Sequence, residues 1–132
     1  MNITSQKAIV NAKKEDIIDV LKASENLEKL LPADKISNFK SDDSQCSFKA
    51  QGGITITLVQ NGTSENELKL KSGAKSPFPF DLTVHLDDHP EGSEGNIVFE
   101  GKVNAFLQMM VQKPLSELFE YMTQALKKHY AQ

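Results

Sequence analysis

The sequence lacks several of the side chains on which common binding sites depend. Among its 132 residues there is no arginine and no tryptophan, so all 15 strongly basic residues are lysines. Arginine provides the planar fork that grips phosphate and guanine in two places, and aromatic rings provide stacking surfaces for bases. Because aromatic residues make up only 7% of a chain whose net charge is -3, the composition predicts no nucleic-acid partner.

The chain is also poor in cysteine and in long apolar runs. Cys46 is the single cysteine, so an internal disulfide is excluded and a reduced, cytoplasmic protein is expected. No apolar stretch approaches the roughly 20 residues that a membrane-spanning helix needs. The first residues lack the apolar core of a secretory signal. We therefore expect no integral membrane segment.

What is present is the composition of one folded domain. Hydrophobic residues make up 39% and charged residues 25% of the chain, which is ordinary for a globular protein. No internal repeat, low-complexity tract or linker divides the sequence. We therefore expect a single domain over residues 1–132.

The N-terminal third predicts one strand followed by two short helices. Residues 3–10 contain β-branched side chains in partial alternation, as strands do. After Asn11, the apolar residues Ile17, Val20 and Leu21 recur at helical spacing. A second helix is expected from Ser24, a candidate N-cap, until Pro32 ends it.

From residue 35 onward the pattern changes to the alternation that is typical of half-buried strands. Turn signals at Gly52–Gly53 and Asn61–Gly62 separate these strands, and the second is a strong hairpin signal. The predicted strands cover residues 36–41, 45–51, 54–60, 67–71, 80–87 and 97–103.

The last segment, from about Ala105 to His129, predicts one long amphipathic helix. Pro114 lies inside it and is expected to kink the helix or to divide it near residues 112–113. The apolar residues at helical spacing are Phe106, Met109, Met110, Leu115, Leu118, Phe119, Met122 and Leu126.

This order of elements predicts an α+β fold. Strands that follow one another through short turns form an antiparallel sheet, and its apolar face must be covered. Only the C-terminal helix is long and apolar enough to do so. We expect about seven strands curved around that helix, with a hollow between helix and sheet where curvature prevents complete filling.

The segments 8–12, 15–21, 24–32 and 115–130 together resemble the helix-grip fold of the START and polyketide-cyclase-like superfamily, also called SRPBCC. The resemblance covers essentially the whole chain. Within the superfamily, the sequence is similar to the small, single-domain bacterial type. It implies a curved sheet gripping the last helix. It does not imply one substrate, because the superfamily contains lipid-transfer domains, hormone binders, cyclases and chaperone cofactors.

The apolar residues expected to point into the hollow form the candidate ligand site. Binding cavities are mainly apolar with few polar anchors, and methionines adapt to irregular ligands. A fully packed core would use the same residues, so that alternative stays open. The predicted lining consists of Phe48, Ile56, Leu58, Leu70, Phe80, Leu82, Val84, Phe99, Met110, Leu118, Phe119 and Met122.

One polar cluster resembles a set of metal ligands. His85, Asp87, Asp88, His89 and Glu91 include imidazoles and carboxylates, which bind divalent ions together. However, they fall at a strand end and in a turn, where side chains are poorly held for metal binding. We favour a polar turn and expect neither a metal nor another cofactor.

Three hypotheses about function follow. The leading one is non-enzymatic binding or carriage of a small hydrophobic ligand, which the resemblance and the apolar lining both favour. The second is a cyclase- or hydratase-like enzyme, for which Asp81, His85 and Glu100 are candidates, although alternation places them on the outer face. The third is a protein-interaction module.

Cys46 lacks a neighbouring base and is interpreted as a buried structural thiol.

Overall fold

The computed structural model describes residues 1–50 and 53–131 and has an α+β fold. An antiparallel sheet carries a long C-terminal helix, as the sequence predicted, and two short helices follow the first strands. The elements, in chain order, are strands β1 (Asn2–Thr4) and β2 (Ala8–Val10), helix α1 (Lys14–Leu21), the 3-10 helix η1 (Ser24–Leu30), strands β3 (Ser37–Ser41), β4 (Gln45–Lys49), β5 (Thr55–Thr63), β6 (Glu67–Ser72), β7 (Phe80–His89) and β8 (Gly92–Gly101), and helix α2 (Ala105–His129).

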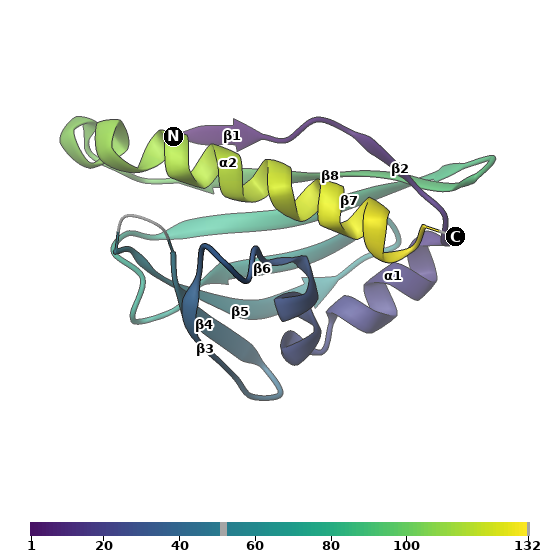
Figure 1. Ribbon diagram of the computed structural model, residues 1–132, viewed down its shortest axis with the longest axis horizontal. Coiled ribbons are helices and arrows are strands. Elements are labelled where there is room, and N and C mark those ends of the chain that lie inside the picture. Colours follow the sequence, from purple (N-terminus) through teal and green to yellow (C-terminus); the bar gives the residue numbers. More distant parts are fainter. Residues whose placement is uncertain (51–52, 132) are drawn as a thin grey trace.

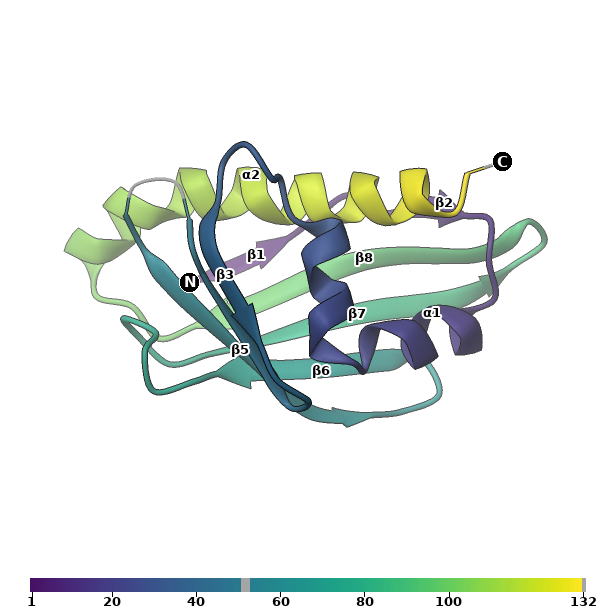
Figure 2. The same cartoon turned by 60° about the horizontal axis from the view of Figure 1, so that its bottom comes forward.

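The sheet is built almost entirely from neighbours in sequence. Its strand order is β1-β8-β7-β6-β5-β4-β3, and β2 also pairs with β8. Figures 1 and 2 show the sheet curving, with α2 lying along one face and α1 near the end of α2. The N-terminal strands β1 and β2 both pair antiparallel with β8. The beginning of the chain therefore lies beside one of its last strands.

Alternation along the strands sends one set of side chains towards α2. In β7, Leu82, Val84 and Leu86 are buried, whereas the residues between them are partly exposed. This is the two-residue period that a sheet with one covered face imposes. From the helix side, Leu115 and Met122 are buried against this face, so α2 and the strands share one apolar core.

Helix α2 begins and ends where the sequence predicted. The Asn104 side chain caps it by accepting a hydrogen bond of 2.8 Å from the backbone N–H of Leu107, which satisfies one of the free donors of the first turn. Pro114 neither ends nor divides the helix, which is continuous over its 25 residues. Of the two outcomes predicted for Pro114, a kink or a division near residues 112–113, the division is therefore wrong.

The first predicted strand is broken into two at Ser5, because the backbone and side chains there bind to α2 as well as to the sheet. The backbone N–H of Gln6 donates to the Glu120 carboxylate at 2.8 Å instead of to a strand. Ser5 Oγ accepts from the N–H of Ile97 at 2.8 Å and lies 2.7 Å from Thr123 Oγ1. Thr123 in turn donates to the carbonyl of Phe119 at 3.0 Å.

The predicted hairpin turn at Asn61–Gly62 is also wrong. Strand β5 continues through both residues to Thr63, with a shift of register between Gln60 and Thr63. Gly62 has a φ of 98°, a backbone conformation that glycine adopts without strain. The signal therefore marked a bulge inside the strand, and the chain turns at residues 64–66 instead.

Smaller differences concern the ends of elements. The helix predicted from Ser24 is a 3-10 helix whose N-cap is Ala23. The last strand begins at Gly92, before the predicted residue 97, and ends at Gly101. Strand β4 ends at Lys49. The predicted end of that strand at Gln51 and the first glycine of the predicted turn lie outside the described residues.

Among the described residues, no helix has both the length and the apolar character needed to cross a bilayer. This agrees with the absence of long apolar runs from the sequence.

The buried chain of hydrogen bonds through Ser5 and Thr123 predicts a measurable contribution to stability. Replacing Ser5 with alanine leaves the N–H of Ile97 and the hydroxyl of Thr123 without their shared partner. Urea unfolding of Ser5→Ala should therefore show a loss of about 1–3 kcal/mol. As a control, Ser116→Ala lies at a partly exposed position of α2, the helix that contains Thr123. It should change the free energy of unfolding by less than about 0.5 kcal/mol.

Combining Ser5→Ala with Thr123→Val should cost less than the sum of the two single changes, because both remove the same contact. Strict additivity of the two losses would show that the two hydroxyls do not act together.

Candidate functional site

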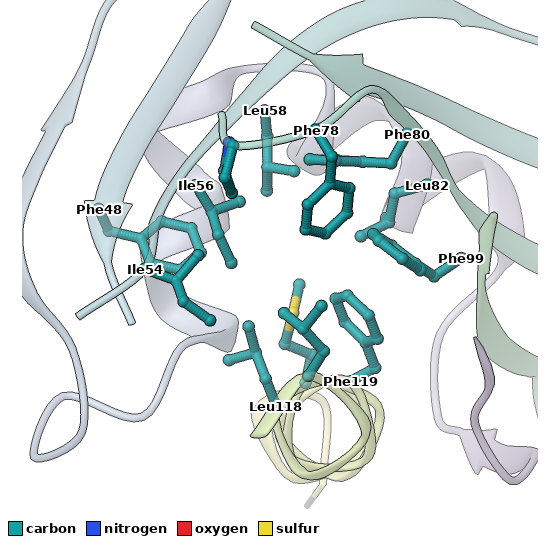
Figure 3. Close-up of a pocket in the computed structure, with 13 residues that line it drawn as sticks. Phe48, Ile54, Ile56, Leu58, Phe78, Phe80, Leu82, Phe99, Leu118 and Phe119 are labelled. Carbon is teal, nitrogen blue, oxygen red and sulfur yellow. The ribbon is translucent and has the colours of Figure 1, made fainter. Parts of the chain in front are cut away.

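A small, largely enclosed apolar void lies between α2 and the sheet (Figure 3). Its volume of about 10 Å³ is about the space that one water molecule occupies. All 13 lining residues are apolar, so a water molecule would find no side-chain partner there. They are Phe48, Ile54, Ile56, Leu58, Pro77, Phe78, Phe80, Leu82, Phe99, Leu115, Leu118, Phe119 and Met122.

Four aromatic rings form the side of this void nearest to β8. The ring centroids of Phe80 and Phe99 are 5.0 Å apart, and those of Phe99 and Phe119 are also 5.0 Å apart. Phe78 meets Phe99 edge to face, with centroids 6.2 Å apart. Figure 3 shows Phe119 rising from α2 towards the rings of the sheet. Such aromatic pairs add stability beyond the area that they bury. We therefore expect these four side chains to be the hardest part of the lining to displace.

Most of the predicted lining residues are brought together here. Those that line the void are Phe48, Ile56, Leu58, Phe80, Leu82, Phe99, Leu118, Phe119 and Met122. Leu70 and Val84 are buried, with 1% of each exposed, but they belong to the packed core outside the lining. The prediction for Met110 is wrong, because its side chain is 60% exposed.

Sequence reasoning missed four residues of the lining. Phe78 lies in the loop before β7, between two prolines, and its ring is buried. Pro77 also lies outside the strands, where alternation gives no signal. Ile54 began the predicted strand 54–60 on the same face as Ile56 and Leu58, so alternation was enough to include it. Leu115 belonged to the apolar set of the helix, so helical spacing alone was enough to include it.

A second, open space adjoins the void on the other side of Leu118. This groove has a volume of about 560 Å³ and lies between α2 and the segments after η1 and β4. Its lining is mixed and comprises Pro32, Lys35, Ile36, Ala50, Pro114, Ser116, Glu117, Leu118, Glu120, Tyr121 and Gln124. Leu118 lines both spaces and is only 7% exposed. Its side chain therefore separates the apolar void from the groove.

The candidate catalytic carboxylates lie on the outer face of the sheet. Asp81 and Glu100 are direct partners across β7 and β8, and both are exposed. Their neighbours Phe80 and Phe99 point the other way, into the core. Neither carboxylate lines the void, so this pair has no enclosed space in which to act.

The histidine cluster forms polar surface contacts at the C-terminal end of β7. His85 Nε2 lies 3.2 Å from Asp87 Oδ2, and His85 Nδ1 lies 3.8 Å from Glu67 Oε2. Asp88 instead lies 3.3 Å from the ammonium group of Lys14. Within residues 1–50 and 53–131, no group of three histidine, cysteine or acidic side chains is arranged to hold a metal ion.

Cys46 is buried in β4, with 1% of its side chain exposed. Burial raises the pKa of its thiol to about 12, although a hydrogen bond with the backbone of Leu58 opposes this shift. The thiol is thus protonated at neutral pH and is a poor nucleophile, since the thiolate is the reactive form.

The raised pKa of Cys46 predicts how stability changes in alkali. Above about pH 9 the unfolded thiol ionises while the folded thiol keeps its proton. The folded state then binds more protons, so the contribution to the free energy of unfolding falls by up to about 1.4 kcal/mol per pH unit. Cys46→Ala lacks this contribution.

Urea unfolding from pH 8 to about pH 11 should show the stability difference between the natural protein and Cys46→Ala narrowing as the pH rises. A constant difference across this range would show that the folded thiol ionises normally.

Known structures share the fold at low sequence identity. The solution structure of the KanY protein superposes with a TM-score of 0.78 at 13% identity, covering 98% of this chain and 97% of that one. TTHA0849 from Thermus thermophilus gives 0.76 at 14% identity, with coverage of 98% and 97%. XoxI from Bacillus cereus gives 0.64 at 13%, with coverage of 98% and 94%.

No family model matches the sequence, and the curated proteins contain no match to it. At these identities, the structural similarity establishes the arrangement of sheet and helix and leaves the function to be argued from the site itself.

Proposed function

We propose that this chain binds a small, largely apolar molecule between its sheet and α2. The observation that supports the proposal is the lining of the void, whose 13 residues are all apolar. A charged ligand would lose its hydration there without gaining a partner. An apolar ligand would gain about 25 cal/mol for each square ångström removed from water.

The ligand has to enlarge the void in order to bind. Sites for small molecules usually measure about 300–1,000 Å³, far above the 10 Å³ of the void but similar to the 560 Å³ of the groove. Leu118 is the side chain shared by the two spaces. Turning it aside would join them, so we propose Leu118 as the gate of the site.

The joined space would favour a molecule with two different ends. Its apolar body would lie against Phe99 and Phe119, while a polar end would remain in the groove near Lys35, Tyr121 and Gln124. A hydroxyl or carbonyl group suits this end, because the groove offers donors and acceptors and stays open to water. The proposed ligand class is therefore amphipathic with one long apolar part.

The positions of the ionisable groups favour binding over catalysis. General acid-base chemistry requires a titratable group beside the reacting atoms. Asp81, His85 and Glu100 lie outside the lining of the void, and Glu117 and Glu120 border only the open groove. The lining of the void contains no titratable side chain, which favours binding of a ligand over its chemical conversion.

The experiment that tests this function uses N-phenyl-1-naphthylamine, an uncharged apolar dye that fluoresces more strongly out of water. We expect saturable binding by the natural protein and an affinity for Leu118→Ala that is higher by roughly fivefold or more, because the gate no longer has to be moved. The measurement is a fluorescence titration with folding checked by circular dichroism.

Leu126→Ala is the matched control. Leu126 is buried in the same helix, with 4% exposed, but lines neither space. It should lose stability, as buried leucines do on truncation, and keep the affinity of the natural protein. Equal affinities for the two variants, or no saturable binding by either, would contradict the proposal.

A further inference from the structure

The first turns of α2 expose an apolar surface that the fold does not use. Phe106 is 75% exposed, Met109 is 84% exposed and Met110 is 60% exposed. Their spacing of three and four residues places them on one side of the helix. We call these three residues the α2 patch. Large side chains exposed together in this way are typical of interaction surfaces.

The same turns already have another face that packs against the protein. Val111 is buried, and Leu107 packs against the core cluster. The α2 patch thus lies on the opposite side of the helix, away from the sheet. Figures 1 and 2 show this end of α2 projecting past the rest of the molecule, so the patch is open to a large partner.

The outward side of α2 changes character after the patch. Further along the helix the exposed positions include Lys113, Glu117, Gln124 and Lys128. A helix that only covers a sheet would be polar along its whole outer side. Tyr121 is also 47% exposed in this later part of α2, so the apolar surface is concentrated at the projecting end, where three large side chains lie within five residues.

The charged side chains in the chain segment that carries the patch are all positive. Residues 101–116 contain Lys102 and Lys113 and no acidic residue, although the net charge of the protein is -3. Both lysines are exposed. The nearest preceding carboxylate, Glu100, lies on the outer face of the sheet beside Asp81. The patch thus has a positive border formed by these two lysines, of which Lys102 also lines a surface depression together with Asp81 and Glu100.

We propose that the α2 patch docks onto an anionic lipid surface. Phe106, Met109 and Met110 would enter the boundary between headgroups and acyl chains, with Lys102 and Lys113 at the level of the phosphates. Apolar residues bordered by lysines are characteristic of helices that lie in a membrane interface. This inference does not depend on the proposed internal ligand.

The positive border also argues against a second copy of this chain as the partner. In a two-fold symmetric contact the same surface meets itself, so Lys102 and Lys113 of both copies would be brought into one contact region. An anionic bilayer instead neutralises both charges while it covers the apolar side chains. A lipid surface therefore satisfies the charge and the exposed apolar area together.

Co-sedimentation with sucrose-loaded vesicles tests this proposal. The protein should bind vesicles of phosphatidylcholine with about one third phosphatidylglycerol and bind pure phosphatidylcholine far more weakly. Raising sodium chloride from about 0.05 to about 0.5 M should reduce the binding. No sedimentation with anionic vesicles would overturn the proposal.

Paired variants separate the apolar and the electrostatic contributions. Met109→Ser with Met110→Ser should weaken the partition by about tenfold or more, whereas Met109→Leu with Met110→Leu should retain it. Lys102→Gln with Lys113→Gln should weaken it by about fivefold or more. The matched change at the other end of the helix, Lys127→Gln with Lys128→Gln, should leave it close to that of the natural protein.

Lys102, Met109, Met110 and Lys113 are all exposed, so the variants at these positions should fold normally. Thermal unfolding checks this. Equal partition of the serine and leucine variants would overturn the proposal. So would a dimer in analytical ultracentrifugation that the serine variant alone dissociates, because the patch would then be an interface between copies.

Discussion

The structure depends on the apolar contact between the inner side of α2 and the curved sheet. Leu115, Phe119 and Met122 of the helix line the same void as side chains of β4, β5, β7 and β8, and burial of this apolar area is the main favourable contribution to folding. Helix α2 is the longest element, and the strands make one face available to it. The hydrogen bonds of Ser5 and Thr123 then fix where along the sheet the helix lies.

The same contact explains why the proposed site is closed. Side chains from both sides leave a void of only about 10 Å³ here, so a ligand would have to displace side chains that stabilise the folded state. The aromatic cluster around Phe99 is held by several ring contacts. Leu118 lines both the void and the open groove, and for that reason we propose it as the side chain that moves.

The sequence predicted the parts of the fold that periodicity determines. The bounds of α2 and the inward residues of β7 follow from regular spacing over many residues. Asn61–Gly62 was wrongly predicted to be a hairpin turn, because a bulge and a turn both use glycine at positive φ. Met110 misled for another reason: the first turns of α2 are apolar on two sides, and spacing alone does not tell which side the sheet covers. Phe78 was missed because no period governs a loop.

The most direct test of the account is a methyl NMR titration with 1-decanol, which has an apolar body and one hydroxyl end. The account predicts that the methyl signals of Ile56, Leu82 and Leu118, which line the void, shift together and saturate. The methyl signals of Ile17 and Leu21 in α1, buried outside the lining, should stay nearly unchanged. Shifts confined to exposed side chains, or equal shifts throughout the core, would contradict binding between the sheet and α2.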